Sequence, residues 1–355
     1  MARVLFFVCI FFIGGITALA QKENNALFDP AERGKDGLRM VFYNVENLFE
    51  PGNDPGVEDD PFTPEGDYQW HYGKYKKKSV NIAKTILAIG GWEAPDLIGL
   101  AEIENWQVLY DLVKHTPLNS YDYRIVHENS PDVRGIDTGV LYRPEKLEEL
   151  SHQVIPYVTG KNIRASRDIL YIRFLTSESD TLHVFVNHWP SRYGGKDQTS
   201  GRRKQAAIQL REVTDSLFSI NAESKIVIMG DFNDEPDDDN LEEALGVINN
   251  GAIGFTPGLY NLMYPYAGSS MGTIYHTDIS GSWFLFDQII VSTALLRETG
   301  LTVIHRRAFI FMSPWLLDAD TGRPYRSFKG PVFTGGYSDH LPVYFDLVYN
   351  KSAFK

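Results

Sequence analysis

A chain of 355 residues with 43% hydrophobic, 13% aromatic and 23% charged residues suits one large domain or two small ones, and this composition excludes a disordered or fibrous protein. The formal net charge of -12 at pH 7 argues against a protein that holds nucleic acid on a broad basic face. The single cysteine excludes a disulfide framework and a zinc finger.

The chain begins with an apolar segment. Residues 1–20 carry one positive charge, Arg3, and their apolar run closes on Ala18-Leu19-Ala20, the small-x-small pattern of a signal-peptidase site. An uncleaved membrane anchor is the alternative, but the run is at the short limit for a membrane span. We therefore expect cleavage after Ala20 and a secreted or periplasmic protein, monomeric and without a membrane span. A lead-in over 21–37 would precede one domain over 38–350.

Strands rich in branched and aromatic residues dominate the rest of the chain. They are predicted at Leu38–Tyr43, Asp96–Ala101, Gly139–Tyr142, Asp168–Phe174, Leu182–Val186, Ile226–Met229, Phe286–Val291 and Val343–Leu347. Helical spacing is predicted over Lys74–Ile89, Asn105–Lys114 and Arg202–Phe218. Because strands outnumber helices and are only sometimes separated by them, the order predicts an α/β fold in which two sheets pack face to face with helices outside.

Two charged segments stand out. The acidic loop, Glu50–Asp67, contains seven acids, four prolines, three glycines and no lysine or arginine. We expect a long, solvated surface loop near the functional site, with a calcium-binding loop as the less favoured alternative. Lys74–Lys78 holds four lysines in five positions, which predicts the solvent-facing side of a helix.

Polar residues follow or precede five of the apolar strands. They are Asn44-Val45-Glu46-Asn47, Glu102, Asn187-His188, Asp231-Phe232-Asn233 and Ser338-Asp339-His340. Because strands hold their end residues rigidly, we expect these ends to lie along one sheet edge and converge on a single site. Carboxylate and amide oxygens suit magnesium or manganese, and histidines can donate to a phosphate. The set therefore predicts metal-assisted hydrolysis of a phosphate ester.

Two short motifs suggest rival functions. Asp231-x-Asn233-x-Glu235 imitates the start of an EF-hand loop, but Pro236 stands where the loop requires glycine. Gly268-Ser269-Ser270-Met271-Gly272 matches the G-x-S-x-G pattern of serine hydrolases, which requires a strand before the serine and a helix after it. The residues on either side predict neither a good strand before the serine nor a helix after it. We therefore expect neither function.

Six motifs stand in order between residues 43 and 340. They are Tyr43-Asn44-Val45-Glu46, Ile98-Gly99-Leu100-Ala101-Glu102, Asn187-His188-Trp189, Gly230-Asp231-Phe232-Asn233, Phe286-Asp287-Gln288-Ile289 and Ser338-Asp339-His340. In this order they resemble the endonuclease/exonuclease/phosphatase superfamily, the fold of deoxyribonuclease-I-like nucleases, abasic-site endonucleases, sphingomyelinases and inositol 5-phosphatases. Trp189-Pro190-Ser191-Arg192 and Gly335-Gly336-Tyr337-Ser338 look like an exported bacterial branch. The resemblance implies a four-layered α/β sandwich of two mainly antiparallel sheets.

The resemblance also implies a metal site. Glu102 looks like the principal ligand, and Asn44, Glu46 and Asp339 would help to hold the ion. That ion would be Mg²⁺ or Mn²⁺, with Ca²⁺ as an alternative. Asn44 would also contact the substrate phosphate.

The catalytic residues are implied in the same way. Asp231 would activate or orient the attacking water, and Asn233 would position both the water and the phosphate. Asp287 would hydrogen-bond His340, fixing its tautomer and favouring its charged form. His188 would donate to a phosphate oxygen.

Three further residues near these motifs have less definite roles. Arg167 loosely matches a phosphate-contacting arginine of the exported branch. Asp137 is a candidate for the carboxylate that pairs with the first histidine, here His188, in deoxyribonuclease-like members. Trp189 is expected to be a packing residue and not a platform for stacking bases.

The sequence does not identify the substrate, but we expect hydrolysis of phosphodiester bonds by a nuclease, with a small phosphoester as the alternative substrate. Arg192–Lys204 holds five basic residues and one acid directly after the His188 motif, which favours a nuclease acting on DNA or RNA, although Arg202-Arg203-Lys204 by itself reads as a solvated helix face. The overall acidity and the acidic loop instead favour a phospholipid, a sugar phosphate or another small phosphoester. An inactive binding protein on this fold is the third alternative, and the complete set of site residues argues against it.

Overall fold

The computed structural model describes residues 36–159, 163–164, 167–249, 253–254, 256–276 and 281–350. The expected signal peptide and all but the last two residues of the lead-in lie outside them. No helix within these ranges is both apolar enough and long enough to cross a membrane.

Two seven-stranded sheets form the centre of the molecule. The first runs in the order β16 (Gly300–Val303), β20 (Val343–Asn350), β1 (Leu38–Leu48), β2 (Leu97–Ile103), β4 (Asp137–Tyr142) and β3 (Arg124–His127), with β17 (Phe309–Ile310) on β20. The second runs in the order β11 (Val247–Ile248), β12 (Leu259–Asn261), β15 (Asp287–Ser292), β10 (Lys225–Asp231), β9 (Thr181–His188), β8 (Ile169–Thr176) and β5 (Leu147–Ile155). Most neighbours are antiparallel, but β1–β2, β9–β10 and β11–β12 are parallel.

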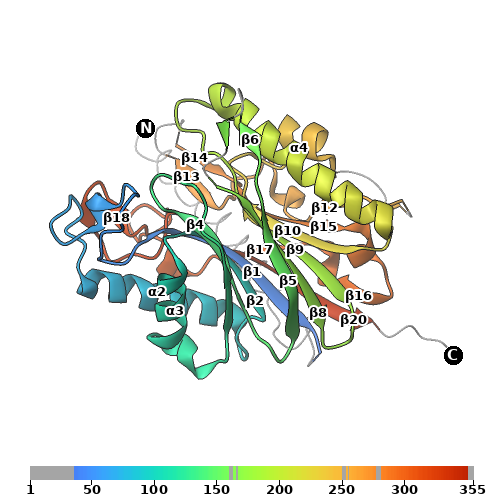
Figure 1. Cartoon of the computed structure of the whole chain (residues 1–355), viewed down its shortest axis with the longest axis horizontal. Coiled ribbons are helices and arrows are strands. Elements are labelled where there is room, and N and C mark those ends of the chain that lie inside the picture. Colours follow the sequence, from blue (N-terminus) through green and yellow to red (C-terminus); the bar gives the residue numbers. More distant parts are fainter. Residues whose placement is uncertain are drawn as a thin grey trace, which may run out of the picture.

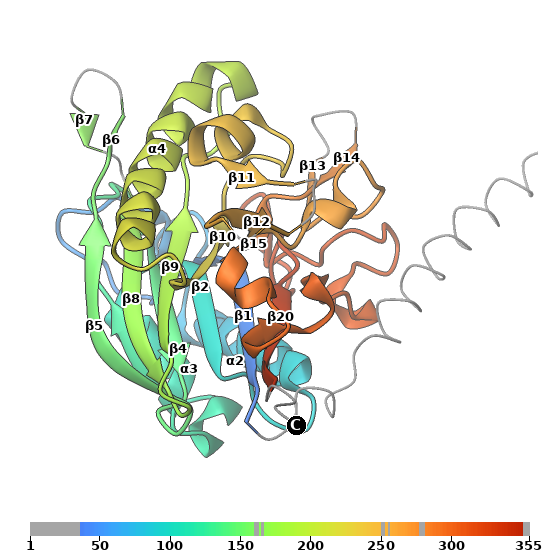
Figure 2. The ribbon, with the colours of Figure 1, turned by 90° about the vertical axis from the view of Figure 1, so that its right-hand side faces the viewer.

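Three helices cover the outer faces of the sheets (Figures 1 and 2). α2 (Tyr72–Gly90) and α3 (Trp106–Lys114) lie beyond the first sheet, and α4 (Lys196–Ile220) lies beyond the second. Side chains cap the N-termini of α2 and α3, because His71 accepts the N–H of Gly73 and Asn105 accepts the N–H of Val108. The order helix, sheet, sheet, helix confirms the four-layered sandwich.

Short elements complete the described chain. The small strand pairs are β6 (Val158–Thr159) with β7 (Ile163–Arg164), β13 (Ile274–His276) with β14 (Ser282–Phe284), and β18 (Phe328–Lys329) with β19 (Val332–Phe333). The short helices are η1 (Asp60–Phe62), η2 (Pro117–Ser120), η3 (Asn240–Leu245), η4 (Tyr264–Tyr266), η5 (Thr293–Leu296), η6 (Ile304–Arg306) and η7 (Pro314–Leu316).

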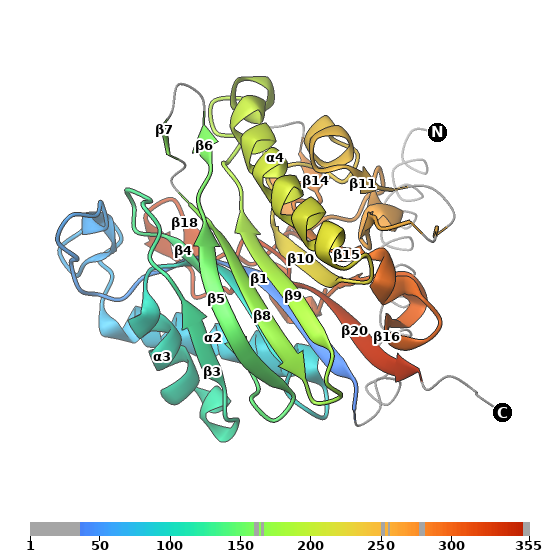
Figure 3. The same cartoon turned by 45° about the vertical axis from the view of Figure 1, so that its right-hand side comes forward.

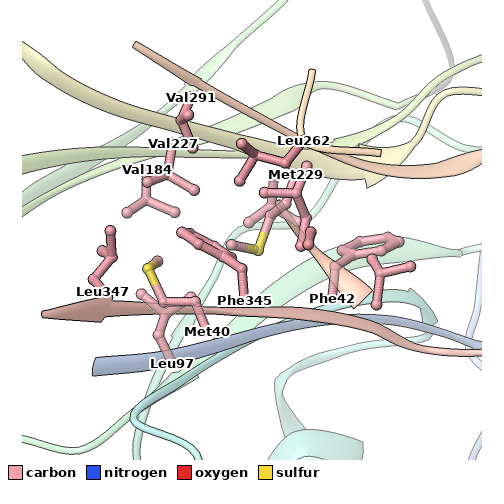
Figure 4. Packing of buried hydrophobic residues seen from close by; sticks show 14 of the residues in the cluster. Met40, Phe42, Leu97, Val184, Val227, Met229, Leu262, Val291, Phe345 and Leu347 are labelled. Atoms are coloured by element: carbon pink, nitrogen blue, oxygen red, sulfur yellow. The ribbon is translucent and has the colours of Figure 1, made fainter. Parts of the chain in front are cut away.

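Three hydrophobic clusters bind the four layers together. In the largest, Met40, Phe42, Leu97, Phe345 and Leu347 of the first sheet face Val184, Val227, Met229, Leu262 and Val291 from the second-sheet side (Figure 4). The second cluster fills the space between the first sheet and α2 and α3, and the third fills the space between the second sheet and α4. The core thus fixes one sheet against the other, which holds the strand ends in place.

All eight predicted strands and all three predicted helices are present, and most extend a few residues beyond the predicted bounds. On α4, Ala206 and Leu210 are buried and Val213 and Leu217 pack beside them, as the spacing predicts. β5 was not predicted because its residues alternate poorly and are mostly exposed at the sheet edge (Figure 3). The serine-hydrolase motif has the one-turn helix η4 before it and β13 after it, so it is not a nucleophile elbow.

Candidate active site

Register alone places three of the expected residues side by side. His188 and Asp231 are partners at the ends of the parallel strands β9 and β10, and Asp231 is also the partner of Asp287 at the start of the antiparallel strand β15. On the first sheet, Asn44 pairs with Ala101, directly before Glu102. The polar ends therefore come from two packed sheets, each contributing a parallel pair, and not from one sheet edge as expected.

Asp231 lies where the site residues of the first sheet meet those of the second sheet. Asn44 Nδ2 donates to Asp231 Oδ2 (3.1 Å) and, more weakly, to Glu102 Oε1 (3.4 Å). The same Asp231 oxygen is 3.6 Å from His188 Nε2 and 3.9 Å from His340 Nε2. Asn233 donates its backbone N–H to Asp231 Oδ1 (3.0 Å). Two histidines, two carboxylates and the Asn44 amide thus lie together, and Asn233 contributes its backbone N–H, because its side-chain amide donates to the carbonyl oxygen of Trp189 (3.1 Å).

The backbone is strained at this point. Eight non-glycine residues of the described chain have positive φ, and four of them belong to the site: Glu46 (52°), Asn47 (54°), Glu102 (61°) and Asn233 (50°). Each such residue costs about 1–3 kcal/mol, and strain of this kind concentrates at functional sites. The pairing of β1 and β2 is irregular here, and Asn47 donates its N–H to Glu102 Oε2 (3.0 Å). The strained turns aim the Glu102 carboxylate at the site.

His340 and Asp287 form a buried pair. His340 Nδ1 lies 2.7 Å from Asp287 Oδ2, and both side chains are almost fully buried. Burial by itself would lower the pKa of His340, but the Asp287 carboxylate, with help from Asp231, raises that pKa well above its usual value. Ser338 fixes the segment, because its hydroxyl donates to Asn44 O and accepts the N–H of His340. His340 is therefore held as a cation.

Burial shifts the pKa values of both Asp231 and His188. Desolvation raises the pKa of Asp231 to about 7, although the charge of His340 opposes this change. Burial lowers the pKa of His188 well below its ordinary value, and the positive charges of Arg167 and Arg134 lower it further. At neutral pH the site thus contains a neutral histidine, a charged histidine and a carboxylate that can accept a proton.

The expected pairing of Asp137 with His188 is not present in the structure. Asp137 binds His127 Nε2 (3.0 Å), and His188 Nδ1 is buried without a hydrogen-bond partner among the described residues. Arg167 donates to the carbonyl oxygen of Trp189 (3.4 Å), which places its charge behind His188. The Trp189 ring is fully buried against Phe232, which confirms packing as its role.

Glu46 and Asp339 have cationic protein partners. Arg326 donates to Glu46 Oε1 (3.2 Å) and to Asp339 Oδ2 (3.2 Å), and Ser327 N–H donates to Glu46 Oε2. Lys78 is completely buried nearby, and burial lowers its pKa to about 8 while the Glu46 charge opposes this change. The negative charge of Glu46 is thus already balanced by side chains of the protein.

The sequence analysis missed Lys78 and Arg326. For Lys78 a signal was available, because it shares the buried stripe of α2 with Ile82, Ile86 and Ile89, whereas Lys76 and Lys77 face solvent as expected. For Arg326, half-exposed in a loop far along the chain, the sequence offers no signal.

The donor set fits a hard divalent cation. Glu102 Oε1 is contacted by Asn44 Nδ2 (3.4 Å) and lies 3.9 Å from His188 Nε2, and the Asn44 Nδ2 group donates to both Glu102 and Asp231, where a cation would also reduce the repulsion between these carboxylates. Within the described residues, no three His, Cys, Asp or Glu side chains already stand in a metal-holding arrangement. Glu102 and Asp231 are therefore the residues that would hold the ion. Asn44 would join them only with its amide turned over, because its Oδ1 accepts the N–H of Glu46 (3.0 Å).

The basic segment after His188 is largely neutralised. Arg192 is paired with Asp238 (2.6 Å) and Asp234 (3.3 Å), and Lys196 with Asp238 (2.5 Å). Arg203 is fully buried and paired with Asp234 (2.8 Å), so it does not belong to a solvated helix face. Three of the five basic residues of this segment are bound by the chain itself.

Comparisons with known proteins agree with this geometry. A sequence model described as the endonuclease/exonuclease/phosphatase family matches residues 39–349. A search of curated protein sequences gave no match.

Several solved structures share the fold. The catalytic domain of human nocturnin, with a bound sulfate anion, is 15% identical with a TM-score of 0.56, over 89% of this chain and 95% of that one. TDP2 of D. rerio in complex with a single-strand DNA product is 17% identical with a TM-score of 0.53, over 89% and 99%. A mannosyl-6-phosphatase of Bacteroides thetaiotaomicron is 19% identical with a TM-score of 0.54, over 88% and 100%.

Proposed function

Because the chain belongs to the endonuclease/exonuclease/phosphatase family, we propose that it hydrolyses phosphate esters with the help of a divalent cation. The observation that supports this most is the placement of His188, Asp231 and His340 around one point, with Glu102 and Asn44 opposite. This arrangement brings together a proton acceptor, proton donors and a cation site, which are the groups that phosphoester hydrolysis requires.

The protein groups divide the reaction between them. Asp231, whose pKa lies near neutrality, accepts a proton from the attacking water. His340, kept charged by Asp287, donates a hydrogen bond to a phosphate oxygen whose negative charge grows in the transition state. His188 Nε2 lies on the other side of Asp231 and helps to orient the phosphate. A Mg²⁺ or Mn²⁺ ion held by Glu102, with Asp231 beside it, would supply further charge stabilisation at the phosphoryl group.

A compact phosphoester, such as a sugar phosphate or a phospholipid headgroup, is the substrate class that the charges favour. The basic segment Arg192–Lys204 is where a nucleic acid could lie. Three of its five basic residues, Arg192, Lys196 and Arg203, are paired with aspartates of the same chain. Nucleic-acid binding depends on cations free to neutralise phosphates.

A nuclease is the second candidate. Arg202 and Lys204 remain exposed on α4, and the likeness to a TDP2 structure that contains a DNA product shows that this fold can accommodate a nucleic-acid strand. This candidate predicts that replacing both exposed residues weakens cleavage of DNA or RNA and reduces its salt dependence.

A substrate panel separates the two candidates. The full chain without its first 20 residues would be assayed with Mg²⁺, Mn²⁺ and Ca²⁺ on plasmid DNA, RNA, chromogenic phosphate mono- and diesters, and sugar phosphates. We expect turnover of a small ester that disappears in chelator and in His340→Ala. Cleavage of DNA or RNA faster than of every small ester would favour the nuclease, and no turnover of any substrate with any of the metals would contradict the proposed chemistry.

We also infer export, because residues 1–20 have the pattern of a cleaved signal peptide. Expression of the full chain in a bacterial host, followed by fractionation and N-terminal sequencing, is expected to give a periplasmic or secreted protein that begins at Gln21. A membrane-bound product that retains Met1 would contradict this inference.

A further inference from the structure

Both carboxylate oxygens of Glu46 are bound by other parts of the chain. Oε1 accepts a hydrogen bond from Arg326 Nε (3.2 Å), and Oε2 accepts the backbone N–H of Ser327. Glu46 is 2% exposed, so the Ser327 N–H would lose its acceptor, without water to replace it, if the carboxylate turned toward a cation. Glu102 differs, because its side chain is 18% exposed and the bond that its Oε1 accepts from Asn44 is long (3.4 Å). The two acids are therefore not equivalent as cation ligands.

Ser327 links Glu46 to a buried lysine of α2. Ser327 and Lys78 are both 0% exposed, and Lys78 Nζ donates a hydrogen bond to Ser327 Oγ. Ser327 Oγ in turn donates to the carbonyl oxygen of Tyr337 (3.1 Å). Burial lowers the pKa of Lys78 to about 8, and the Glu46 carboxylate is the first of the charges that oppose this change. Lys78, Ser327 and Glu46 thus form one buried unit at the start of Ser327–Tyr337, the anchored segment.

The same side of α2 binds the far end of the anchored segment. Asn81 is buried, and its Nδ2 donates to the carbonyl oxygen of Gly336 (2.7 Å). Lys84 Nζ donates to the hydroxyl of Tyr337 (3.0 Å). Both residues follow Lys78 at intervals of three, which places all three polar side chains along one side of the helix. α2 therefore holds the anchored segment at both of its ends.

We propose that Glu46 does not bind the catalytic cation but, together with Lys78, positions His340. The anchored segment ends directly before Ser338-Asp339-His340, so fixing this segment on α2 and on the end of β1 fixes the approach of the chain to the catalytic histidine. Glu46 is then a positioning residue that acts through His340, and the cation depends on Glu102. The inference rests on the proposed function, because it concerns the cation that Glu102 would hold there.

Two substitutions made together distinguish a positioning residue from a cation ligand. Glu46→Gln alone removes a negative charge near the cation, which weakens cation binding whether or not Glu46 is a ligand. Glu46→Gln combined with Lys78→Met removes one charge of each sign, so the net charge is unchanged while the carboxylate is absent. Because neither charge of this pair is then left buried alone, the anchored segment should keep its place better than in either single variant. The double variant therefore tests the carboxylate itself.

Calorimetric titration of Mn²⁺ into the purified chain is the first measurement. We expect the double variant to bind one Mn²⁺ with a dissociation constant within about threefold of the parent's, whereas Glu102→Gln should weaken binding by more than about tenfold. A loss of binding in the double variant as large as in Glu102→Gln overturns this inference and leaves the proposed function standing. Parental binding by Glu102→Gln, or no binding by the parent, contradicts the cation site of the proposed function, and the inference falls with it.

Turnover of bis(p-nitrophenyl) phosphate at saturating Mn²⁺ is the second measurement. Displacement of His340 should lower the kcat of Glu46→Gln and of Lys78→Met by about 100-fold, and the double variant should return to within about tenfold of the parent. Lys77→Met, which removes an exposed lysine next to Lys78, is the matched control and keeps the parental kcat.

Two kinetic results would overturn the positioning role. One is a parental kcat in both single variants, and the other is a double variant whose losses simply add. Thermal unfolding first shows which variants are folded. If a single variant does not unfold cooperatively, the double variant is compared with the parent alone, and a kcat more than about tenfold below the parent's counts against the role.

Discussion

Replacing Asp231 by asparagine should strongly reduce activity and stabilise the protein at the same time. Burial raises the pKa of Asp231 from 3.8 to about 7, so the folded chain carries an unfavourable charge at alkaline pH. At about 1.4 kcal/mol for each pKa unit, this charge costs at most about 4 kcal/mol. The asparagine can no longer accept from both Asn44 and Asn233, and that lost hydrogen bond takes back about 1 kcal/mol. The substitution also removes the Asp231 charge that favours the charged form of His340. The expected net gain in the free energy of unfolding is therefore about 2 kcal/mol.

The pH dependence of this gain has a definite sign. An acid whose pKa is raised by folding costs nothing below its ordinary pKa, and the cost grows as the pH rises from about 4 to about 7. Unfolding of the parent and of Asp231→Asn in chelator should therefore give nearly equal stabilities at pH 4 and the full gain at pH 8. Loss of the proton acceptor should reduce kcat/KM by about 10²–10⁴-fold.

A matched control makes the same chemical change at another buried aspartate. Asp346 accepts two hydrogen bonds from Arg39 (2.7 and 2.5 Å), so Asp346→Asn removes the counter-charge that binds this buried guanidinium most directly. We expect a loss of about 3–5 kcal/mol. If Asp231→Asn destabilises the protein at pH 8 as Asp346→Asn does, or if it retains parental activity, the role assigned to Asp231 is wrong.

Two further predictions concern buried charge pairs. In Asp287→Asn, the carboxylate no longer opposes the lowering of the His340 pKa by burial, so His340 loses its proton at a lower pH. The alkaline limb of the kcat/KM profile should therefore move to lower pH, and an unmoved limb would contradict the role of the pair. Arg203→Met leaves Asp234 buried with weaker partners and should cost about 3 kcal/mol in chemical unfolding. Arg202→Met, at an exposed neighbouring position, should change stability by less than about 0.5 kcal/mol, and equal effects would contradict the burial of Arg203.

The sequence was sufficient to place eight strands of the two large sheets and to single out the polar residues at their ends. Branched and aromatic runs such as Ile226–Met229 mark buried strands, and the polar residue that follows each run marks where the strand leaves the core. His188 and Asp231 could be expected to converge because both end apolar runs. The pairing that makes them neighbours, β9 parallel to β10, depends on long-range packing that no local pattern encodes.

The remaining features depend on tertiary structure. The left-handed backbone of Glu102 is imposed by the irregular pairing of β1 and β2 and not by its residue type. Lys78 and Arg203 were assigned to solvent-facing surfaces by their charge, yet both are fully buried because Ser327 and Asp234 bind them there. A charged residue is usually exposed, but a residue from elsewhere in the chain can bind it in the core, and the local sequence does not reveal that partner.

The most direct test of the central claim is the hydrolysis of bis(p-nitrophenyl) phosphate by the purified chain with Mg²⁺ or Mn²⁺, compared with Glu102→Gln and His340→Ala. The parent should release nitrophenol only when the metal is present, and each variant should lose at least about 100-fold in kcat/KM while melting as a folded protein. Parental turnover in chelator, or in both variants, would contradict the site built from these residues.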